Sequence, residues 1–408
     1  MPSKLFTPAH IGPLTLRNRT IRSAAFENMC PGHRPSKMLA DYHLSVARGG
    51  VGMTTIAYAS VNRSGLSFDN QLWMRPEIVG ELRDLTDAIH REGAKASIQL
   101  GHCGNMSHRS TAGRMPISAS SGFNLYSPTF VHGMNEDEIQ EVARDFGTAV
   151  QLAIDAGFDC VEIHAGHGYL ISQFLSPYTN RRHDRWGGDL DSRMNFMRLC
   201  MEHVMQAANG QVVVVVKTNM RDGFKSGNGL AEGIAIAREL EQLGADALVL
   251  SGGFVSKAPM YVMRGEMPIR TMTHYMNCLW LKYGVRMFGK MMIKNEPYSD
   301  LYFLDDALQV RHEVKLPLIY VGGCVSREGI DKVLDCGFEA VQMARALLNE
   351  PDFVNRMAAG EERCGCTHTN YCIARMYTLE MSCHKHRTDL PPCLLKEIEK
   401  IELKNGQR

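Results

Sequence analysis

The residues with the clearest chemical potential are His164, His167 and Tyr169, which follow an apolar run and are interleaved with glycines. Two imidazoles at this spacing can direct N–H groups at one oxygen and stabilise negative charge that develops on a carbonyl. A phenol keeps its proton at neutral pH and can deliver it to carbon, which makes Tyr169 a candidate general acid. A metal site is the competing interpretation of the two histidines, but we cannot place a third ligand.

A second candidate is Lys217, which follows five consecutive valines at residues 212–216. Such a run predicts a strand that is buried on both faces. A lysine at its end offers a fixed cation. If burial favours the neutral amine, the same lysine offers a nucleophile for Schiff-base chemistry, so an aldolase or lyase is an alternative enzyme class.

Short apolar runs separated by segments of helical periodicity recur along the whole chain. The runs predict strands and the periodic segments predict helices. Strands are expected at residues 21–26, 52–60, 95–101, 160–165, 212–218, 247–252, 316–322 and 340–344. Helices are expected at residues 37–48, 76–92, 136–156, 193–208, 231–243, 307–314, 326–336 and 352–359, and Asn135 and Ser326 are expected to cap two of them.

The alternation of eight strands with eight helices predicts an α/β protein with a parallel sheet and right-handed crossovers. Eight such units close a (β/α)8 TIM barrel. An open doubly wound sheet is the alternative, but residues 23–28 after the first strand lack the glycine-rich dinucleotide fingerprint. We therefore expect a barrel whose active site lies at the C-terminal ends of the strands.

Composition narrows the classes of function. The chain has 408 residues, and its 45 basic and 44 acidic side chains leave a net charge of +1. This balance argues against a broad electrostatic footprint for nucleic acid or an anionic membrane. No apolar run approaches the ~18 residues of a membrane span, and the first residues lack the apolar stretch of a signal peptide. We expect a cytoplasmic enzyme without nucleic-acid or membrane partners.

Several motifs in the same order resemble those of the Old Yellow Enzyme family of FMN-dependent ene-reductases, over about residues 4–385. The chain is most similar to the branch that contains 2,4-dienoyl-CoA reductase, trimethylamine dehydrogenase and bacterial NADH:flavin oxidoreductases. The motifs are Leu-Phe-Thr-Pro at 5–8, Arg-Ser-Ala-Ala at 22–25, Gln-Leu-Gly-His at 99–102, the segment 157–188, Val-Gly-Gly at 321–323 and Met-Ala-Arg at 343–345.

The resemblance implies noncovalent FMN, NADH or NADPH as hydride donor, and a small activated alkene such as an enone as substrate. It implies that His164 and His167 bind the substrate carbonyl and that Tyr169 protonates the α carbon after hydride reaches the β carbon. The cofactor-binding residues it implies are Ser23, Ala24, Ala25 and Ala57 beside the ring, Gln99 at the pyrimidine edge, Lys217 near N1 and O2, and Gly322, Gly323, Ala344 and Arg345 at the phosphate. Ala344 replaces a usual glycine, which is tolerable if its φ is negative.

We expect a barrel over residues 1–360 and a cysteine-rich extension over residues 361–408 packed on it. A long excursion after the sixth strand, residues 254–306, either packs against the barrel or forms a lid over the substrate. A homo-oligomer is compatible with the sequence.

The extension contains Cys366, Cys372 and Cys383, in a register similar to that of the four-iron cluster of the dienoyl-reductase branch. Thr369 stands where the second cysteine would be, and a hydroxyl does not replace a thiolate ligand. We therefore expect no complete cluster and no metal. A zinc site that adds His368 or His384, in a non-catalytic zinc-binding or redox-sensing barrel, is the remaining alternative.

Overall fold

The computed structural model describes residues 3–276, 278–376 and 378–406, and a closed barrel of eight parallel strands forms its centre. The strands are β3 (Thr20–Arg22), β4 (Met53–Ser60), β5 (Lys95–Gly101), β9 (Cys160–His164), β10 (Val213–Asn219), β11 (Ala247–Ser251), β12 (Leu318–Val321) and β13 (Ala340–Met343). The barrel closes where β13 pairs with β3, with Met343 opposite Arg22. The predicted (β/α)8 TIM barrel is confirmed. Each of the eight predicted strands overlaps an observed one, but the first, predicted at residues 21–26, ends at Arg22.

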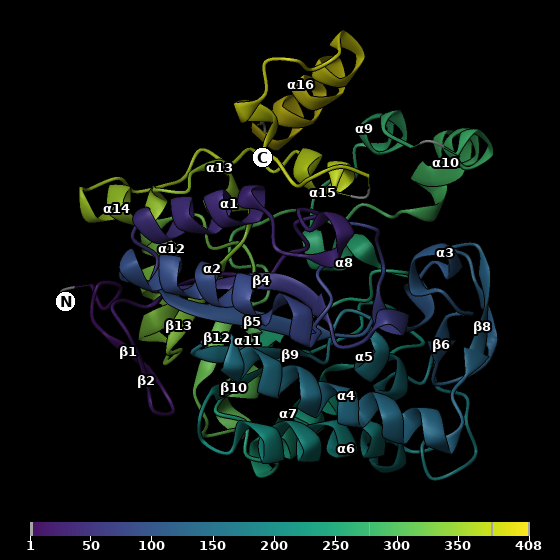
Figure 1. Cartoon of the computed structure of the whole chain (residues 1–408). Helices are drawn as coiled ribbons and strands as arrows, with labels where there is room; N and C mark the ends of the chain where they lie inside the picture. The colour runs from purple at the N-terminus through teal and green to yellow at the C-terminus, as the bar shows by residue number, and fades with distance from the viewer. Residues whose placement is uncertain (1–2, 277, 377, 407–408) are drawn as a thin grey trace.

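Eight helices follow the strands and surround the barrel (Figure 1). They are α1 (Lys37–Arg48), α2 (Val79–Arg91), α4 (Glu136–Asp155), α6 (Leu190–Ala208), α7 (Leu230–Gln242), α11 (Leu304–Glu313), α12 (Arg327–Asp335) and α14 (Phe353–Ala358). Both predicted N-caps are confirmed: Asn135 forms a capping box with Glu138, and the Ser326 side chain accepts a hydrogen bond from the Gly329 amide. Each cap satisfies a backbone donor that the first turn leaves without a helical partner.

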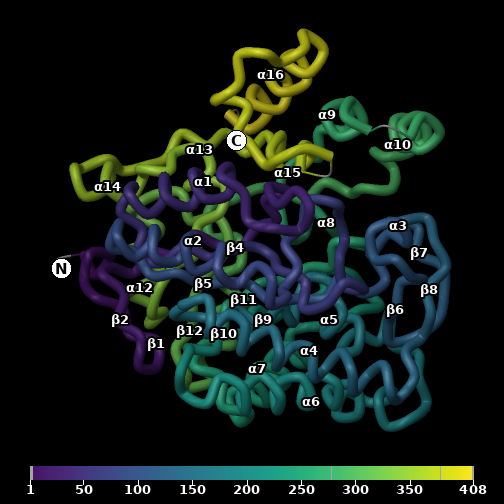
Figure 2. The backbone as a smooth tube through the Cα atoms, viewed as in Figure 1, coloured from purple at the N-terminus to yellow at the C-terminus, as the bar shows by residue number. Residues whose placement is uncertain are grey.

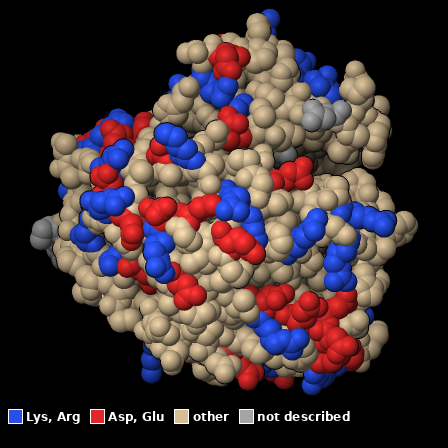
Figure 3. Space-filling model, viewed as in Figure 1, with Lys and Arg blue, Asp and Glu red and all other residues tan. Residues whose placement is uncertain are grey.

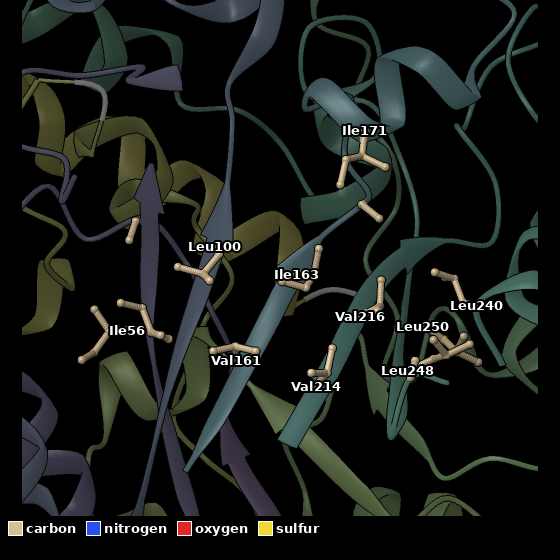
Figure 4. Close-up of a cluster of buried hydrophobic side chains, with 14 of the residues drawn as sticks. Ile56, Leu100, Val161, Ile163, Ile171, Val214, Val216, Leu240, Leu248 and Leu250 are labelled. Carbon is tan, nitrogen blue, oxygen red and sulfur yellow. The ribbon is translucent and has the colours of Figure 1, made fainter. Parts of the chain in front are cut away.

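The two-residue periodicity of the strands decides what faces the inside of the barrel. In β10, Val214 and Val216 pack in the layer between strands and helices, as Figure 4 shows. Val213 and Val215 point the other way and pack in the separate apolar cluster inside the barrel. The predicted strand buried on both faces is therefore confirmed. The next residue on the inner face is Lys217, which lies nearer the C-terminal mouth.

A short hairpin closes the N-terminal end of the barrel. It consists of β1 (Ala9–Ile11) and β2 (Leu14–Leu16), which pair antiparallel. Its apolar side chains pack in the same cluster as the inner residues of the barrel strands. This end is therefore filled with apolar side chains, and the polar interior lies toward the opposite end.

The excursion and the C-terminal extension pack against each other above the barrel (Figures 1 and 2). The excursion contains α8 (Pro259–Met263), α9 (Ile269–His274) and α10 (Leu279–Met292), and the extension contains α15 (Tyr371–Arg375) and α16 (Pro392–Gly406). An apolar cluster joins them, with Met260 and Met272 from the excursion and Ala374 from α15. No helix within the described ranges is long and apolar enough to cross a membrane.

Candidate active site

The two histidines and the tyrosine predicted from the sequence come together at the mouth of the barrel. His164 is the last residue of β9, and its Nδ1 faces the Gly166 amide at 3.4 Å. This contact leaves Nε2 as the nitrogen that carries the proton. His167 has a left-handed backbone, with φ of 58°, and the Asn219 side chain accepts a hydrogen bond from its amide. The turn sets the His167 ring 5.0 Å from the His164 ring, measured between centroids.

Tyr169 completes this group from the first turn after the strand. It is the N-cap of α5 (Leu170–Leu175), and its ring centroid lies 4.4 Å from that of His164. Tyr58 of β4 packs edge-on against Tyr169 at 5.0 Å, and its hydroxyl is 2.7 Å from the Ser67 hydroxyl. The phenol is therefore half-buried in an aromatic surrounding next to the imidazoles.

Both imidazoles are neutral in this environment. Burial, together with the neighbouring His167 and Lys217, lowers the pKa of His164 well below its ordinary value. Burial and the Lys217 charge lower the pKa of His167 to about 3. Neutral rings can donate N–H hydrogen bonds without adding charge to the site. The His167 Nε2 already lies 2.7 Å from the Ser251 hydroxyl at the end of β11, an interaction that the sequence did not predict.

Lys217 lies inside the barrel in a fully connected polar network. Its Nζ is 2.9 Å from a Glu162 carboxylate oxygen, and both side chains are only 2% exposed. Glu162 also accepts hydrogen bonds of 2.6 Å from the side-chain amides of Gln99 and Gln342. The Ser23 hydroxyl joins the network by donating to Gln342 at 2.9 Å and by lying 3.5 Å from the Lys217 ammonium.

Glu162 and Gln342 are therefore site residues that our sequence analysis missed. The signal for Glu162 was available, because it lies two residues before His164 and so points to the same inner face of β9. A carboxylate at the inner face of a buried strand needs a cationic or hydrogen-bonding partner. Gln342 is a polar residue between apolar neighbours on β13, and the same argument could have identified it.

The small residues expected beside a flavin ring line one wall of the mouth. Ala24 and Ala57 pack in an apolar cluster that includes Tyr169, and Ala25 packs in an adjoining one. The Ala57 amide donates to the Glu27 carboxylate at 3.1 Å, so this N–H is already used within the protein. Glu27 in turn forms a buried ion pair of 2.6 Å with Arg22, which the sequence analysis also missed.

The glycine pair and Arg345 lie together at the ends of β12 and β13. Gly322 and Gly323 have φ of 131° and 75°, conformations that side chains disfavour. Ala344 has φ of −104°, so the methyl group in place of the family's glycine causes no backbone strain. The Arg345 guanidinium donates to the Asn370 side chain at 2.7 Å and lies over the Tyr298 ring.

The cysteines of the extension gather beside Arg345 around a small cavity of about 20 Å³. Its lining includes Cys366, Thr369, Cys372 and Cys383, the four positions compared above with a four-iron site. Burial raises the pKa of Cys372 to about 12 and that of Cys383 to about 11, so these thiols are protonated at neutral pH. The described residues include no group of three or more His, Cys, Asp or Glu side chains arranged to hold a metal ion.

The family model for NADH:flavin oxidoreductase / NADH oxidase matches residues 4–363. A 4,4'-dithiodibutanoate disulfide reductase of Rhodococcus erythropolis is 39% identical over 92% of this chain and 93% of its own length. An NADPH dehydrogenase of Bacillus subtilis is 33% identical over 65% of this chain and 78% of its own. Other curated relatives are longer, and this chain spans 49% of one of them.

Among solved structures, an Old Yellow Enzyme homologue from Zymomonas mobilis superposes with a TM-score of 0.72 at 22% identity, over 96% of this chain and 99% of that one. The fold and the matches together define a flavin-dependent oxidoreductase. The chain belongs to the NADH:flavin oxidoreductase / NADH oxidase family. It is an FMN-dependent NAD(P)H oxidoreductase, as the sequence resemblance implied.

The residues present fit an FMN group. Lys217 offers a cation in the barrel interior, and Gln99 offers an amide beside it. For a phosphate, Arg345 at the end of β13 offers a guanidinium, one N–H of which already donates to Asn370. The adjoining Gly322 and Gly323 are packed against residues 299–303. The Schiff-base alternative has no support, because an ammonium paired with a buried carboxylate has no free electron pair with which to attack a carbonyl.

The first prediction concerns the buried ion pair. Glu162→Gln and Lys217→Met should each lower the free energy of unfolding of the flavin-free protein by about 3–5 kcal/mol, because each leaves one buried charge without its partner. The double variant should lose less than the sum by about 1–3 kcal/mol. Urea unfolding of the four proteins measures this coupling, and additive losses would show that the two charges do not stabilise each other.

The second prediction concerns pH. The pKa of His102 and of His167 is lowered to about 3, and that of His368 to about 2, chiefly by burial. These values lie below the ~6.5 of an unfolded histidine. The unfolded chain therefore binds protons that the folded chain does not, and the free energy of unfolding should decrease as the pH falls from about 6.5 toward 3, by up to ~1.4 kcal/mol per pH unit for each histidine.

Urea unfolding of the flavin-free protein between pH 7 and pH 5 measures this dependence. His102→Gln should reduce the slope of the free energy of unfolding against pH by the contribution of about one proton, ~1.4 kcal/mol per pH unit. The reason is that position 102 no longer takes up a proton in the unfolded chain. A variant with the wild-type slope would contradict the assignment of His102 as a neutral buried histidine.

The third prediction concerns the cysteine cavity. Thr369 supplies a hydroxyl in place of a thiolate, and metal ligation requires deprotonated cysteines. Anaerobic purification followed by iron and acid-labile sulfide analysis should find both far below stoichiometric amounts. About four irons and four sulfides per chain would contradict this expectation.

Proposed function

We propose that this oxidoreductase reduces the carbon–carbon double bond of an activated alkene such as an enone. The observation that supports the proposal best is the grouping of two neutral imidazoles with a phenol, in which the His164 ring contacts both the His167 ring and the Tyr169 ring. Bound FMN would supply the hydride for the β carbon, after reduction by NADH or NADPH.

The imidazoles bind and polarise the substrate carbonyl. His164 carries its proton on Nε2, because its Nδ1 faces the Gly166 amide. Negative charge develops on the carbonyl oxygen when hydride reaches the β carbon, and an N–H donor at that oxygen stabilises the charge. His167 contributes a second donor through Nδ1 when the Ser251 hydroxyl donates to its Nε2, because the neutral ring then carries its proton on Nδ1.

Tyr169 holds the proton that the α carbon receives. The aromatic packing with Tyr58 and the position at the start of α5 fix the phenol beside the imidazoles. A carbonyl held by His164 places its α carbon within reach of a neighbouring acid, which is the geometric requirement for general acid catalysis.

A second candidate activity is the reduction of an organic disulfide. It is favoured by the 39% identity to the Rhodococcus erythropolis disulfide reductase over nearly the whole chain. A hydride that attacks one sulfur gives a thiol and a thiolate, so no proton has to be placed on carbon. The two activities therefore differ in their need for Tyr169.

The fourth prediction uses this difference. Tyr169→Phe should slow the reduction of a simple enone by about 10²–10⁴-fold, the contribution of a positioned general acid. Reduction of the bound flavin by NAD(P)H should remain near the wild-type rate, because it needs no proton from the phenol. Stopped-flow measurement of the two half-reactions separates the effects, and Tyr283→Phe on the exposed face of α10 is the matched control.

His164→Ala should instead weaken the binding of a phenolic ligand, read as a flavin absorbance change during titration. An enone rate in Tyr169→Phe equal to that of the wild type would overturn the proton-donor role. If 4,4'-dithiodibutanoate is reduced much faster than every enone tested, with no effect of Tyr169→Phe, the disulfide activity replaces the proposed one.

A further inference from the structure

The outer face of α10 is apolar and uncovered. Trp280, Met287 and Met291 recur at helical spacing on one face and are 69%, 71% and 73% exposed. Leu279, Tyr283, Phe288 and Met292 of the same helix are exposed as well. Isolated apolar side chains on a surface are ordinary, but a contiguous patch of this kind marks an interaction site.

The opposite face of α10 is fixed to the rest of the protein. Val285 and Ile293 pack against the apolar cluster that joins the excursion to the extension. Gly289 between them is buried, and a Cβ there would lie 3.1 Å from Ile269 of α9. The inner face therefore has its packing partners, and the exposed face cannot be buried by a simple rotation of the helix.

The segment that carries α10 has charges of a single sign, although Glu266, just before it, lines a cavity together with Lys290. Residues 267–295 contain no Asp or Glu, and they contain five cations, Arg270, Lys282, Arg286, Lys290 and Lys294. Within the described ranges, the four cations on or just after α10 form no ion pair. The net charge of the whole chain, +1, conceals this local excess. In Figure 3 the surface over α10 is mostly tan, in keeping with its apolar side chains.

This charge argues against a second copy of the chain as the covering partner. A symmetric contact would place Arg286, Lys290 and Lys294 near the same cations of the other copy, with no carboxylate on the helix to offset them. An anionic partner removes this repulsion. A partner with an anionic surface and an apolar layer just below it can also bury the exposed tryptophan and methionine side chains.

We propose that α10 docks the enzyme on the surface of an anionic phospholipid bilayer. The helix lies in the plane of the interface, with Trp280, Met287 and Met291 inserted among the acyl chains and Lys290 and Lys294 at the headgroups. An amphipathic helix with cations beside an apolar face binds membranes in this way. The contact is peripheral and reversible, and it places the excursion next to the lipid.

Flotation of the FMN-loaded enzyme with vesicles tests the proposal. Vesicles of equal parts phosphatidylcholine and phosphatidylglycerol should carry the protein, and vesicles of phosphatidylcholine alone should carry much less. Raising the salt concentration should weaken binding, because salt screens the attraction between cations and headgroups. Trp280→Ser/Met287→Ser should lower the partition coefficient at least about tenfold.

Two matched variants control for apolar area and for net charge. Leu125→Ser/Phe130→Ser removes exposed apolar side chains near β7 (Gly122–Asn124) and β8 (Thr129–Gly133) and should leave binding unchanged. Lys290→Glu/Lys294→Glu should lower binding by at least about fivefold for each cation removed. Lys225→Glu/Lys315→Glu changes the net charge equally at exposed positions elsewhere and should have little effect.

NADPH oxidation and the thermal unfolding midpoint should match the wild type in every variant, which separates a docking defect from misfolding. Equal flotation with neutral and anionic vesicles, or none with either, would overturn the proposal. So would a dimer, detected by light scattering, that Trp280→Ser/Met287→Ser converts to a monomer, because α10 would then be the interface between two copies.

Discussion

One buried carboxylate, that of Glu162, determines how the polar part of the barrel interior is built. It neutralises the Lys217 ammonium and accepts hydrogen bonds from both Gln99 and Gln342. An ammonium without such a partner in the middle of a barrel would be strongly destabilising. The lysine and both amides, which come from three different strands, therefore converge on this one acceptor.

The fold could be predicted because the barrel strands carry their pattern locally. Alternation in β10 separates Val214 and Val216 from the inner Val213 and Val215, and each run is bounded by a helical segment. The hairpin of β1 and β2 could not be predicted in the same way. Its strands are three residues long, and they form because they cover the apolar end of a barrel made mostly of later residues.

In the site, too, contacts within one short segment could be predicted, and contacts between distant segments could not. His164, His167 and Tyr169 belong to one short segment, so their meeting requires only a strand end and a turn. The contact of His167 with Ser251 depends on strands that are far apart in the sequence, and only the closed barrel brings them together. The packing of the excursion on the extension could not be predicted either. The hydrophobic pattern of each segment shows that one face is buried, but it does not show which segment covers that face.

The hydrogen bond from Arg345 to Asn370 joins the end of the barrel to a residue that is synthesised after it. All eight strands are complete at Met343, before the extension has been made. A growing chain can therefore close its barrel while the guanidinium still lacks its side-chain partner. Asn370 also donates to the backbone of Arg264 and Glu266, so one late residue locks the excursion and the end of β13 together. Final assembly of this corner of the molecule must wait until Asn370 has been made.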